Sequence, residues 1–310
     1  MKIAVIGAGA MGSMYGSWLS QKNEIIFIDV NKETIDNINN KGVTIKYEDK
    51  EITYSNVKGF LSGEYKEKAD LVIVFVKSNY TKDAIEQNKD IIGDKTIVMT
   101  LQNGYGNDEI ISQYVPQERI LLGICRHNAV MLSPANIKYG GGKYTAIGST
   151  SGNMALAESV KSLMEECGIE TIIDEDIKRA IWWKLFANMT INPITALFGT
   201  KIGYVIDNPN AWEVTKNIIR EGVEVAKKDG VEFDLSEAFE SASFSCRIAH
   251  EGYTSMYQDV KKKIPTEIDA INGAVVKLGE KFGVDVPYNR IMVDMIHMLE
   301  STYFMEKEEN

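Results

Sequence analysis

The first half of the chain alternates short apolar runs with segments in which apolar residues recur every three or four positions. The runs predict buried strands, and the periodic segments between them predict helices. Such alternation is typical of βαβ units and a mostly parallel sheet. The predicted strands cover residues 2–7, 24–29, 69–77, 95–102, 118–126, 143–148 and 169–174, with a smaller β insertion at 43–58. The predicted helices are one that ends near residue 20 and those at 32–40, 82–92 and 153–166.

After residue 174 the strand-like runs disappear and long helical patterns follow. Helices are predicted over residues 176–192, 208–229, 234–250, 266–281 and 288–307. The fold class that we expect is therefore an α/β domain of the Rossmann type over residues 1–174, with a mostly parallel sheet, followed by an all-helical domain over residues 175–310.

Three polar residues interrupt the apolar segment "WWKLFANMTINPITALFG" at the start of the helical half. Lys184, Asn188 and Asn192 lie four residues apart, so a helix places them in one stripe. Such side chains are costly to bury without partners, which suggests a binding role. The alternative is that the asparagines satisfy the backbone of a broken helix, because Pro193 disfavours helical geometry at Asn192, so that the stripe is expected to kink at its far end.

Composition and charge narrow the classes of function. The chain has 310 residues, of which 44% are hydrophobic and 25% charged, as is ordinary for a soluble globular protein. A net charge of −10 argues against binding to nucleic acid or anionic membranes. Three dispersed cysteines and no Cys/His cluster indicate no metal site and a reducing, cytoplasmic location. No window reaches the roughly 18 apolar residues of a membrane span.

The sequence "GAGAMG" lies directly after the first predicted strand. Gly7, Gly9 and Gly12 have the GxGxxG spacing, which in a strand–turn–helix context predicts a dinucleotide-binding loop. The helix N-terminus behind the glycines favours phosphate charge. The alternative is a glycine-rich turn without a ligand. The residues of the candidate loop are Gly7, Ala8, Gly9, Ala10, Met11 and Gly12.

Asp29 ends the second predicted strand. A carboxylate there can accept hydrogen bonds from ribose hydroxyls and repels a 2′-phosphate, which favours NAD(H) over NADP(H). The alternative is a turn or cap residue. Asn31 and Lys32 could accommodate a phosphate, so NADP(H) stays open.

Two further strand ends carry polar residues. Lys77 ends "LVIVFVK", and Asn103 follows "IVMTLQ" in the glycine-containing loop "LQNGYGN". Ligands of open α/β sheets bind beyond the carboxyl ends of strands, so both residues are candidates for the cofactor site. The alternatives are a solvated lysine and a turn-forming asparagine.

Several segments in this order resemble one enzyme family over nearly the whole chain. They are "GAGAMG", "KSNYTKDAI", "LQNGYGN", "WWKLFANMTINPITALFG" and "SMYQDVKKKIPTEIDAINGAVVKLGEKFGVDVP". The family is 2-dehydropantoate 2-reductase, also called ketopantoate reductase. The resemblance implies a Rossmann domain joined to a helical domain like that of 6-phosphogluconate dehydrogenase. It also implies reduction of the ketone of 2-dehydropantoate by a nicotinamide cofactor, on the route to pantothenate.

The resemblance assigns roles by motif. Lys184 matches the catalytic lysine, Glu267 an active-site glutamate and Lys77 a lysine near the cofactor. The residues that match polar positions of the substrate site are Asn103, Asn188, Asn192 and Ser255. Three departures stand out: NADP-dependent members carry arginine at the position of Asp29, Ile202 replaces a substrate-contacting asparagine, and "CRHNAV" at 125–130 replaces a more typical Thr-His-Gly-Ala-like stretch.

These residues suit hydride transfer to a ketone, which leaves negative charge on the ketone oxygen. Lys184 could donate the proton, and its pKa would fall if neighbouring rings desolvated it. Glu267 could orient the site, or could only compensate a helix dipole. Two alternatives remain: a relative that acts on another 2-oxo acid, and an NAD(H) sensor without turnover. The expected partner is a small 2-oxo acid, and a homodimer is left open.

Overall fold

The computed structural model describes residues 1–305 and divides into two compact units. The first unit comprises Met1–Gln102 and Asn107–Ile177, and the second comprises Asn103–Gly106 and the chain from Lys178 onward. The last two residues of the helix predicted over 288–307 lie outside the described residues. The segment 103–106, which the sequence analysis included in the α/β domain, packs with the helices instead.

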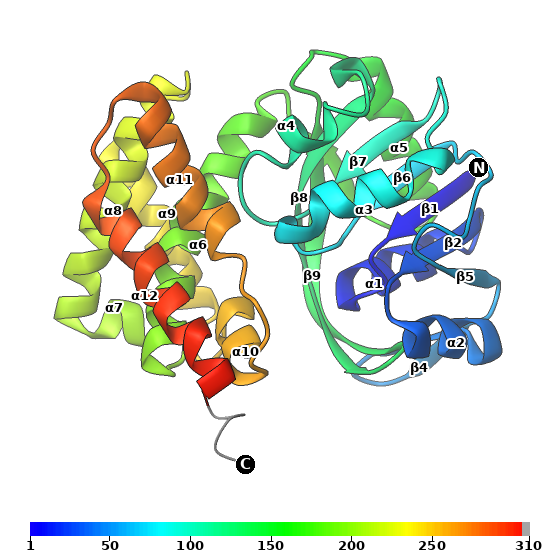
Figure 1. Ribbon diagram of the computed structural model, residues 1–310, viewed down its shortest axis with the longest axis horizontal. Coiled ribbons are helices and arrows are strands. Elements are labelled where there is room, and N and C mark those ends of the chain that lie inside the picture. Colours follow the sequence, from blue (N-terminus) through cyan, green and yellow to red (C-terminus); the bar gives the residue numbers. More distant parts are fainter. Residues whose placement is uncertain (306–310) are drawn as a thin grey trace. The chain divides into compact units, whose positions relative to one another are not determined.

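The first unit is built on a ten-stranded sheet, counted over the described residues, with the order β4-β3-β9-β8-β7-β6-β1-β2-β5 and β10 paired to β9 (Figure 1). Only the pairs β3–β4 and β8–β9 are antiparallel, so the prediction of a mostly parallel sheet is confirmed. The strands are β1 (Lys2–Ile6), β2 (Glu24–Asp29), β3 (Val43–Lys46), β4 (Glu51–Tyr54), β5 (Val57–Leu61), β6 (Leu71–Val74), β7 (Ile97–Thr100), β8 (Ile120–Ser133), β9 (Asn136–Gly148) and β10 (Thr171–Ile173).

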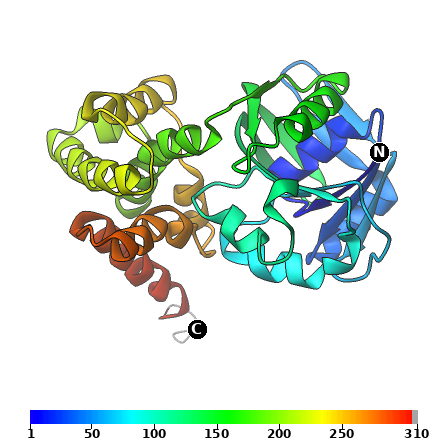
Figure 2. The same ribbon diagram turned by 90° about the horizontal axis from the view of Figure 1, so that it is seen from above.

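Both faces of this sheet are covered, which explains why its central strands read as continuous apolar runs. In β1, Ile3 and Val5 belong to one hydrophobic core, whereas Ala4 and Ile6 belong to the other. Figure 2 shows α5 in green and α3 in cyan on opposite sides of the blue strands. The helices of the first core are α1 (Ala10–Leu19), α2 (Lys32–Lys41) and α5 (Met154–Glu166); those of the second are α3 (Thr81–Gln87) and α4 (Asn107–Ile111).

The hairpin of β8 and β9 is longer than the sequence indicated, because the predicted strands at 118–126 and 143–148 covered only its apolar ends. Its outer part packs an aromatic cluster in which the His127 ring lies 5.2 Å from Trp18 and 6.2 Å from Tyr139. Burial lowers the pKa of His127, and its Nε2 atom is buried without a hydrogen-bond partner.

The second unit consists of helices, as predicted, with two short ones that the periodicity did not indicate, α7 (Tyr204–Asp207) and α10 (Ser255–Lys261). The others are α6 (Ile177–Phe198), α8 (Pro209–Lys228), α9 (Leu235–Ile248), α11 (Ile268–Phe282) and α12 (Pro287–Met305). The expected end of the first helix at Asn192 was wrong, because α6 continues through Pro193 to Phe198. Among residues 1–305, no helix has the length and apolarity needed to cross a membrane.

Candidate active site

The glycine loop connects β1 to α1, and each of its three glycines has a distinct steric reason. Gly7 has φ +98°, and a Cβ there would lie 2.6 Å from the backbone nitrogen of Val76. A Cβ on Gly12 would lie 1.9 Å from the carbonyl oxygen of Gly7, so helix and strand could not approach. A Cβ on Gly9 would meet nothing within 4 Å. Only Gly9 therefore borders open space, where a ligand could approach the backbone.

The N-terminus of α1 offers backbone donors at the same place. The helix begins at Ala10, its cap residue Gly9 provides no side-chain hydrogen bond, and its first turn contains no acidic residue. The first N–H groups of a helix have no acceptor within that helix, and the helix dipole adds positive charge there. Ala10 and Met11 are only partly buried. These features fit the pyrophosphate of a dinucleotide.

Asp29 is hydrogen-bonded to the glycine loop. Its Oδ2 atom accepts a hydrogen bond from the backbone N–H of Ala8 at 2.7 Å, and its Oδ1 atom accepts one from the N–H of Asn31 at 2.8 Å. The residue therefore has the turn-stabilising role that was the alternative in the sequence analysis. A carboxylate has about four acceptor positions, so these two bonds leave capacity for ribose hydroxyls.

Lys77 lies after β6, which neighbours β1 in the sheet, so it belongs to the same edge as the glycine loop. The backbone around it is fixed by Gln102, which the sequence analysis did not single out. Gln102 Nε2 donates to the carbonyl oxygen of Val76 at 2.6 Å and to Thr81 Oγ1 at 2.9 Å. The loops that follow β6 and β7 are thereby joined.

Lys184, Asn103 and Glu267 meet within the helical unit. Lys184 Nζ donates to Asn103 Oδ1 at 2.9 Å, and Asn103 Nδ2 donates to Glu267 Oε2 at 3.5 Å. The second distance is at the long limit for a hydrogen bond. Asn103 thus stands between the lysine and the glutamate, although it is 81 residues from the lysine in the chain.

Tyr105 explains how Asn103 reaches this position. The backbone N–H of Tyr105 donates to the carbonyl oxygen of Ala270 at 2.9 Å, its hydroxyl donates to Asp229, and its ring lies 5.1 Å from Trp182. Gly104 has φ +87°, and a Cβ there would lie 2.5 Å from the same carbonyl oxygen of Ala270. Tyr105 was not predicted as a site residue, because its only local signal in the sequence is its place between two glycines.

The polar stripe of α6 occupies the face that two hydrophobic cores leave uncovered. One core takes residues such as Trp182, Phe186 and Met189, and the other takes Ala187 and Ile191. The rings of Trp182 and Phe186 therefore belong to a core of the helical unit. The stripe itself comprises Lys184 and Asn188, both partly buried, and Asn192, which is buried.

Ser255 is placed near the far end of this stripe by its neighbour Thr254. Thr254 Oγ1 caps α10 by accepting from the N–H of Tyr257 at 3.1 Å, and it shares a 2.8 Å hydrogen bond with Thr195 Oγ1 on α6. Thr195 lies one helical turn beyond Asn192. Ser255, the first residue of α10, is exposed.

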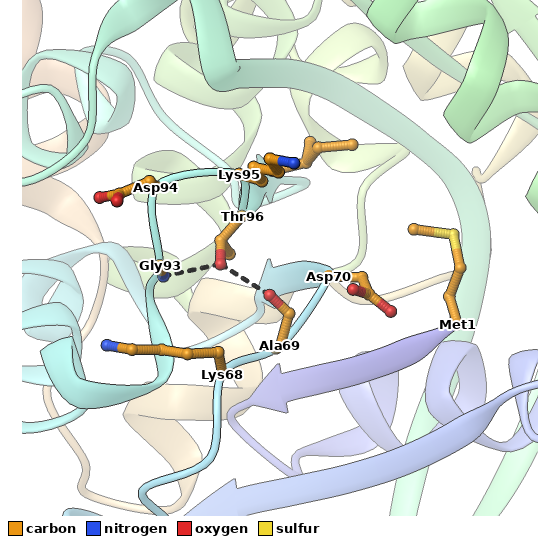
Figure 3. Close-up of a pocket in the computed structure, with 9 residues that line it drawn as sticks. Met1, Lys68, Ala69, Asp70, Gly93, Asp94, Lys95 and Thr96 are labelled. Atoms are coloured by element: carbon orange, nitrogen blue, oxygen red, sulfur yellow. Dashed lines mark hydrogen bonds between the residues drawn. The ribbon is translucent and has the colours of Figure 1, made fainter.

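A cavity of about 550 Å³ in the α/β unit lies at the opposite edge of the sheet (Figure 3). Its lining includes Met1, Asp70 and Thr96, which directly precede β1, β6 and β7. Thr96 Oγ1 donates to the carbonyl oxygen of Ala69 at 2.6 Å and accepts from the N–H of Gly93 at 2.8 Å. Ligands of open α/β sheets bind at the carboxyl ends of strands, so this cavity is not the cofactor site.

Comparison with known proteins gives full-length matches. The family model described as "Ketopantoate reductase PanE/ApbA" matches residues 3–152, and the model of its C-terminal domain matches residues 176–300. A 2-dehydropantoate 2-reductase of Archaeoglobus fulgidus is 31% identical over 302 residues, which is 97% of this chain and 98% of that protein. The same enzyme of Streptococcus pyogenes serotype M1 is 32% identical over 305 residues, with the same coverage of both chains.

Solved structures agree with these matches. The ternary structure of D-mandelate dehydrogenase with NADH and anilino(oxo)acetate has a TM-score of 0.91 at 30% identity, covering 98% of this chain and 99% of that one. A putative 2-dehydropantoate 2-reductase from Enterococcus faecalis has a TM-score of 0.79 at 29% identity, with the same coverage. From the two domain matches and the full-length relatives, it follows that this chain belongs to the ketopantoate reductase PanE/ApbA family.

Proposed function

We propose that the protein reduces 2-dehydropantoate to pantoate with a reduced nicotinamide cofactor, and that Lys184 is the general acid. The observation that carries this proposal is the position of Lys184: it lies in the polar stripe of α6 and donates a hydrogen bond to Asn103 at 2.9 Å. The full-length relatives that bear this enzyme's name support the choice of substrate.

The cofactor supplies the hydride that adds to the ketone carbon. Negative charge then develops on the ketone oxygen, and an ammonium group held against that oxygen stabilises the charge and transfers the proton. The hydrogen bond to Asn103 orients the Lys184 ammonium for this task. An ammonium has three donors, so a bond to Asn103 is compatible with a second one to substrate.

We assign substrate binding to the polar groups around the lysine. Asn188 and Asn192 offer amide donors and acceptors without adding charge, which suits a hydroxyl or carbonyl group. Ser255 would bind the carboxylate of the substrate. Glu267, held by Asn103, would accept a hydrogen bond from a substrate hydroxyl.

The glycine loop, Asp29 and Lys77 form the proposed cofactor site, and we propose that NADH is preferred over NADPH. The carboxylate of Asp29, at the end of β2, would repel the 2′-phosphate of NADPH. Solved relatives of at least 29% identity with NADH bound support this preference.

A second candidate substrate is a different 2-oxo acid. The similarity to D-mandelate dehydrogenase, at 30% identity and a TM-score of 0.91, favours it, because that protein is named for another 2-hydroxy acid. Ile202, where the family resemblance expects an asparagine, would leave an apolar position for a bulkier side group.

Steady-state oxidation of NADH and NADPH with a panel of 2-oxo acids tests these proposals. We expect the highest kcat/KM with 2-dehydropantoate; higher values with phenylglyoxylate would support the second candidate. Cofactor binding without turnover on any acid would indicate a sensor. For the mechanism, Lys184→Ala should lower kcat by about 100- to 10,000-fold, the usual contribution of a general acid, with NADH binding retained. The control is Lys201→Ala, which removes an exposed lysine paired with Glu251.

The remaining proposals concern the cellular location and the oligomeric state of the protein. We propose a cytoplasmic protein, which cell fractionation tests. The homodimer stays a prediction, and sedimentation equilibrium of the purified protein would decide between monomer and dimer.

A further inference from the structure

The helix that carries the polar stripe runs through a proline. A proline in a helix has no N–H, and its ring crowds the carbonyl of the residue four positions earlier. In α6 the proline is Pro193, and the carbonyl that loses its helical partner is that of Met189. This carbonyl lies between Asn188 and Asn192 in the chain, so its position affects the stripe directly.

A buried side chain of another helix takes the place of the missing donor. Asn272 on α11 directs its Nδ2 atom to the Met189 carbonyl oxygen at a distance of 2.8 Å. Asn272 is fully buried, and burying an amide is costly unless it gains hydrogen bonds. Its Oδ1 atom is buried without a partner, so the side chain has been placed for its donor and not for its acceptor.

The orientation of the Asn272 amide is fixed by hydrogen bonds that involve α12 and α8. Asn272 Nδ2 also donates to Asn289 Oδ1 at 3.0 Å, and Asn289 Nδ2 donates to Glu221 Oε2 at 2.8 Å. Glu221 accepts from the N–H groups of Tyr288 and Asn289 as well, at 2.8 and 2.9 Å. A chain of polar groups, partly buried at Glu221 and buried at Asn289 and Asn272, therefore extends from α8 through α12 and α11 to the released carbonyl of α6.

We infer that Asn272 is a positioning residue that replaces the N–H lost at Pro193 and so keeps Lys184, Asn188 and Asn192 on one face of α6. Without it, the Met189 carbonyl would be buried and unsatisfied, and the helix would have to shift at the proline to reach another donor. The part that concerns substrate rests on the proposed function; the part that concerns the helix does not.

A double-mutant cycle between Asn272 and Pro193 tests the inference. In Pro193→Ala the new N–H can bond to the Met189 carbonyl, so the side chain of Asn272 is no longer needed there. We expect Asn272→Ala alone to raise KM for the 2-oxo acid about tenfold while the dissociation constant of NADH is unchanged. It should also raise the equilibrium constant for unfolding about 10- to 100-fold, because a buried carbonyl is left without a hydrogen bond. In the Pro193→Ala background the rise in KM should shrink to about twofold. The loss of stability should also be smaller there, because only the bond to Asn289 is then left without a replacement.

The control is Asn208→Ala, which removes the side-chain cap of α8 and leaves Asn272, Asn289 and the bond to Met189 in place. We expect its effect to be the same in both backgrounds. Equal losses for Asn272→Ala with and without Pro193→Ala would overturn the inference, because they would mean that Asn272 only fills the core. If Asn272→Ala does not fold, recovery of folded protein in the double variant is the same rescue, and failure of the double variant to fold overturns the inference.

The urea midpoint and the yield of folded protein do not depend on any substrate. A rescue seen in these measurements, with no reduction of any 2-oxo acid by the unmodified protein, would therefore uphold the replacement of the N–H and refute the proposed function alone. Rescue of stability without any change of KM in the single variant would overturn the link between Asn272 and the stripe.

Discussion

Gly9→Ala separates binding of the cofactor from the stability of the fold. Gly9 has φ −68° and ψ −171°, values that alanine adopts readily, and its added Cβ would touch no atom of the protein within 4 Å. Alanine is a poorer helix cap than glycine by roughly 0.5 kcal/mol or more, but it also reduces the entropy of the unfolded chain by about 0.4–1 kcal/mol. The two effects oppose each other, so the melting temperature should change by less than about 4 °C.

The same methyl group would occupy the space in which a pyrophosphate approaches the backbone. Loss of one hydrogen bond from a backbone N–H to a charged group costs about 1.5–3 kcal/mol, which raises the dissociation constant about 10- to 150-fold. The assay is quenching of protein fluorescence by NADH, together with thermal unfolding of the same sample. A dissociation constant that changes less than threefold would refute the assignment of this loop to the cofactor.

Gly12→Ala serves as the opposite case. Its Cβ would lie 1.9 Å from the carbonyl oxygen of Gly7, so the helix and the strand must separate. Overpacking of this kind costs about 3 kcal/mol or more, and the melting temperature should fall by about 6–12 °C. Equal destabilisation by Gly9→Ala and Gly12→Ala would contradict the claim that only Gly12 lacks space for a Cβ atom.

Three further predictions concern charge and the polar loop. Asp29→Asn removes the charge and keeps one of the two acceptors that bind the N–H groups of Ala8 and Asn31, so kcat/KM can fall for both cofactors. The ratio of kcat/KM for NADH to that for NADPH should still fall about tenfold or more, because a 2′-phosphate is no longer repelled; an unchanged ratio contradicts the proposed role. Tyr105→Phe removes the hydroxyl that donates to Asp229, and the loss of such a bond should raise KM for the 2-oxo acid about tenfold, with NADH binding unaffected. A normal KM would show that the loop is held without it. Burial lowers the pKa of His127, so the unfolded chain binds this proton more readily and stability falls as pH drops below about 6.5. His127→Phe should reduce that fall in urea unfolding between pH 6.5 and 5, and equal pH dependence in both proteins would contradict it.

Local sequence patterns were sufficient to predict the central strands of the sheet, because each strand is a continuous apolar run of neighbouring residues. The runs at Ile3 to Ile6 and Leu71 to Val74 are apolar on both faces, and this indicates a strand between two helical layers before any tertiary contact is known. The outer part of the β8–β9 hairpin was missed because its residues are mixed and glycine-rich, and its aromatic partners, such as Trp18, lie more than 100 residues away.

The candidate site shows where local rules fail. The helix predicted over residues 176–192 stopped before Pro193, but the donor that compensates for Pro193 comes from Asn272, which is 83 residues from the carbonyl that it binds. In the same way, the bond of Tyr105 to Asp229 spans 124 residues. No periodicity could indicate either contact, although the spacing of the polar stripe itself was visible in the sequence.

The short segment Asn103–Gly106 has a consequence for any attempt to divide the protein. The polypeptide leaves the α/β unit after Gln102, contributes four residues to the helical unit and returns at Asn107. A cut near residue 177 would leave Lys184 on one fragment and its hydrogen-bond acceptor Asn103 on the other. The helical fragment alone would also lack Tyr105, whose ring lies 5.1 Å from that of Trp182. Fragment complementation, and not separate expression, is therefore the experiment that could restore this site from two pieces.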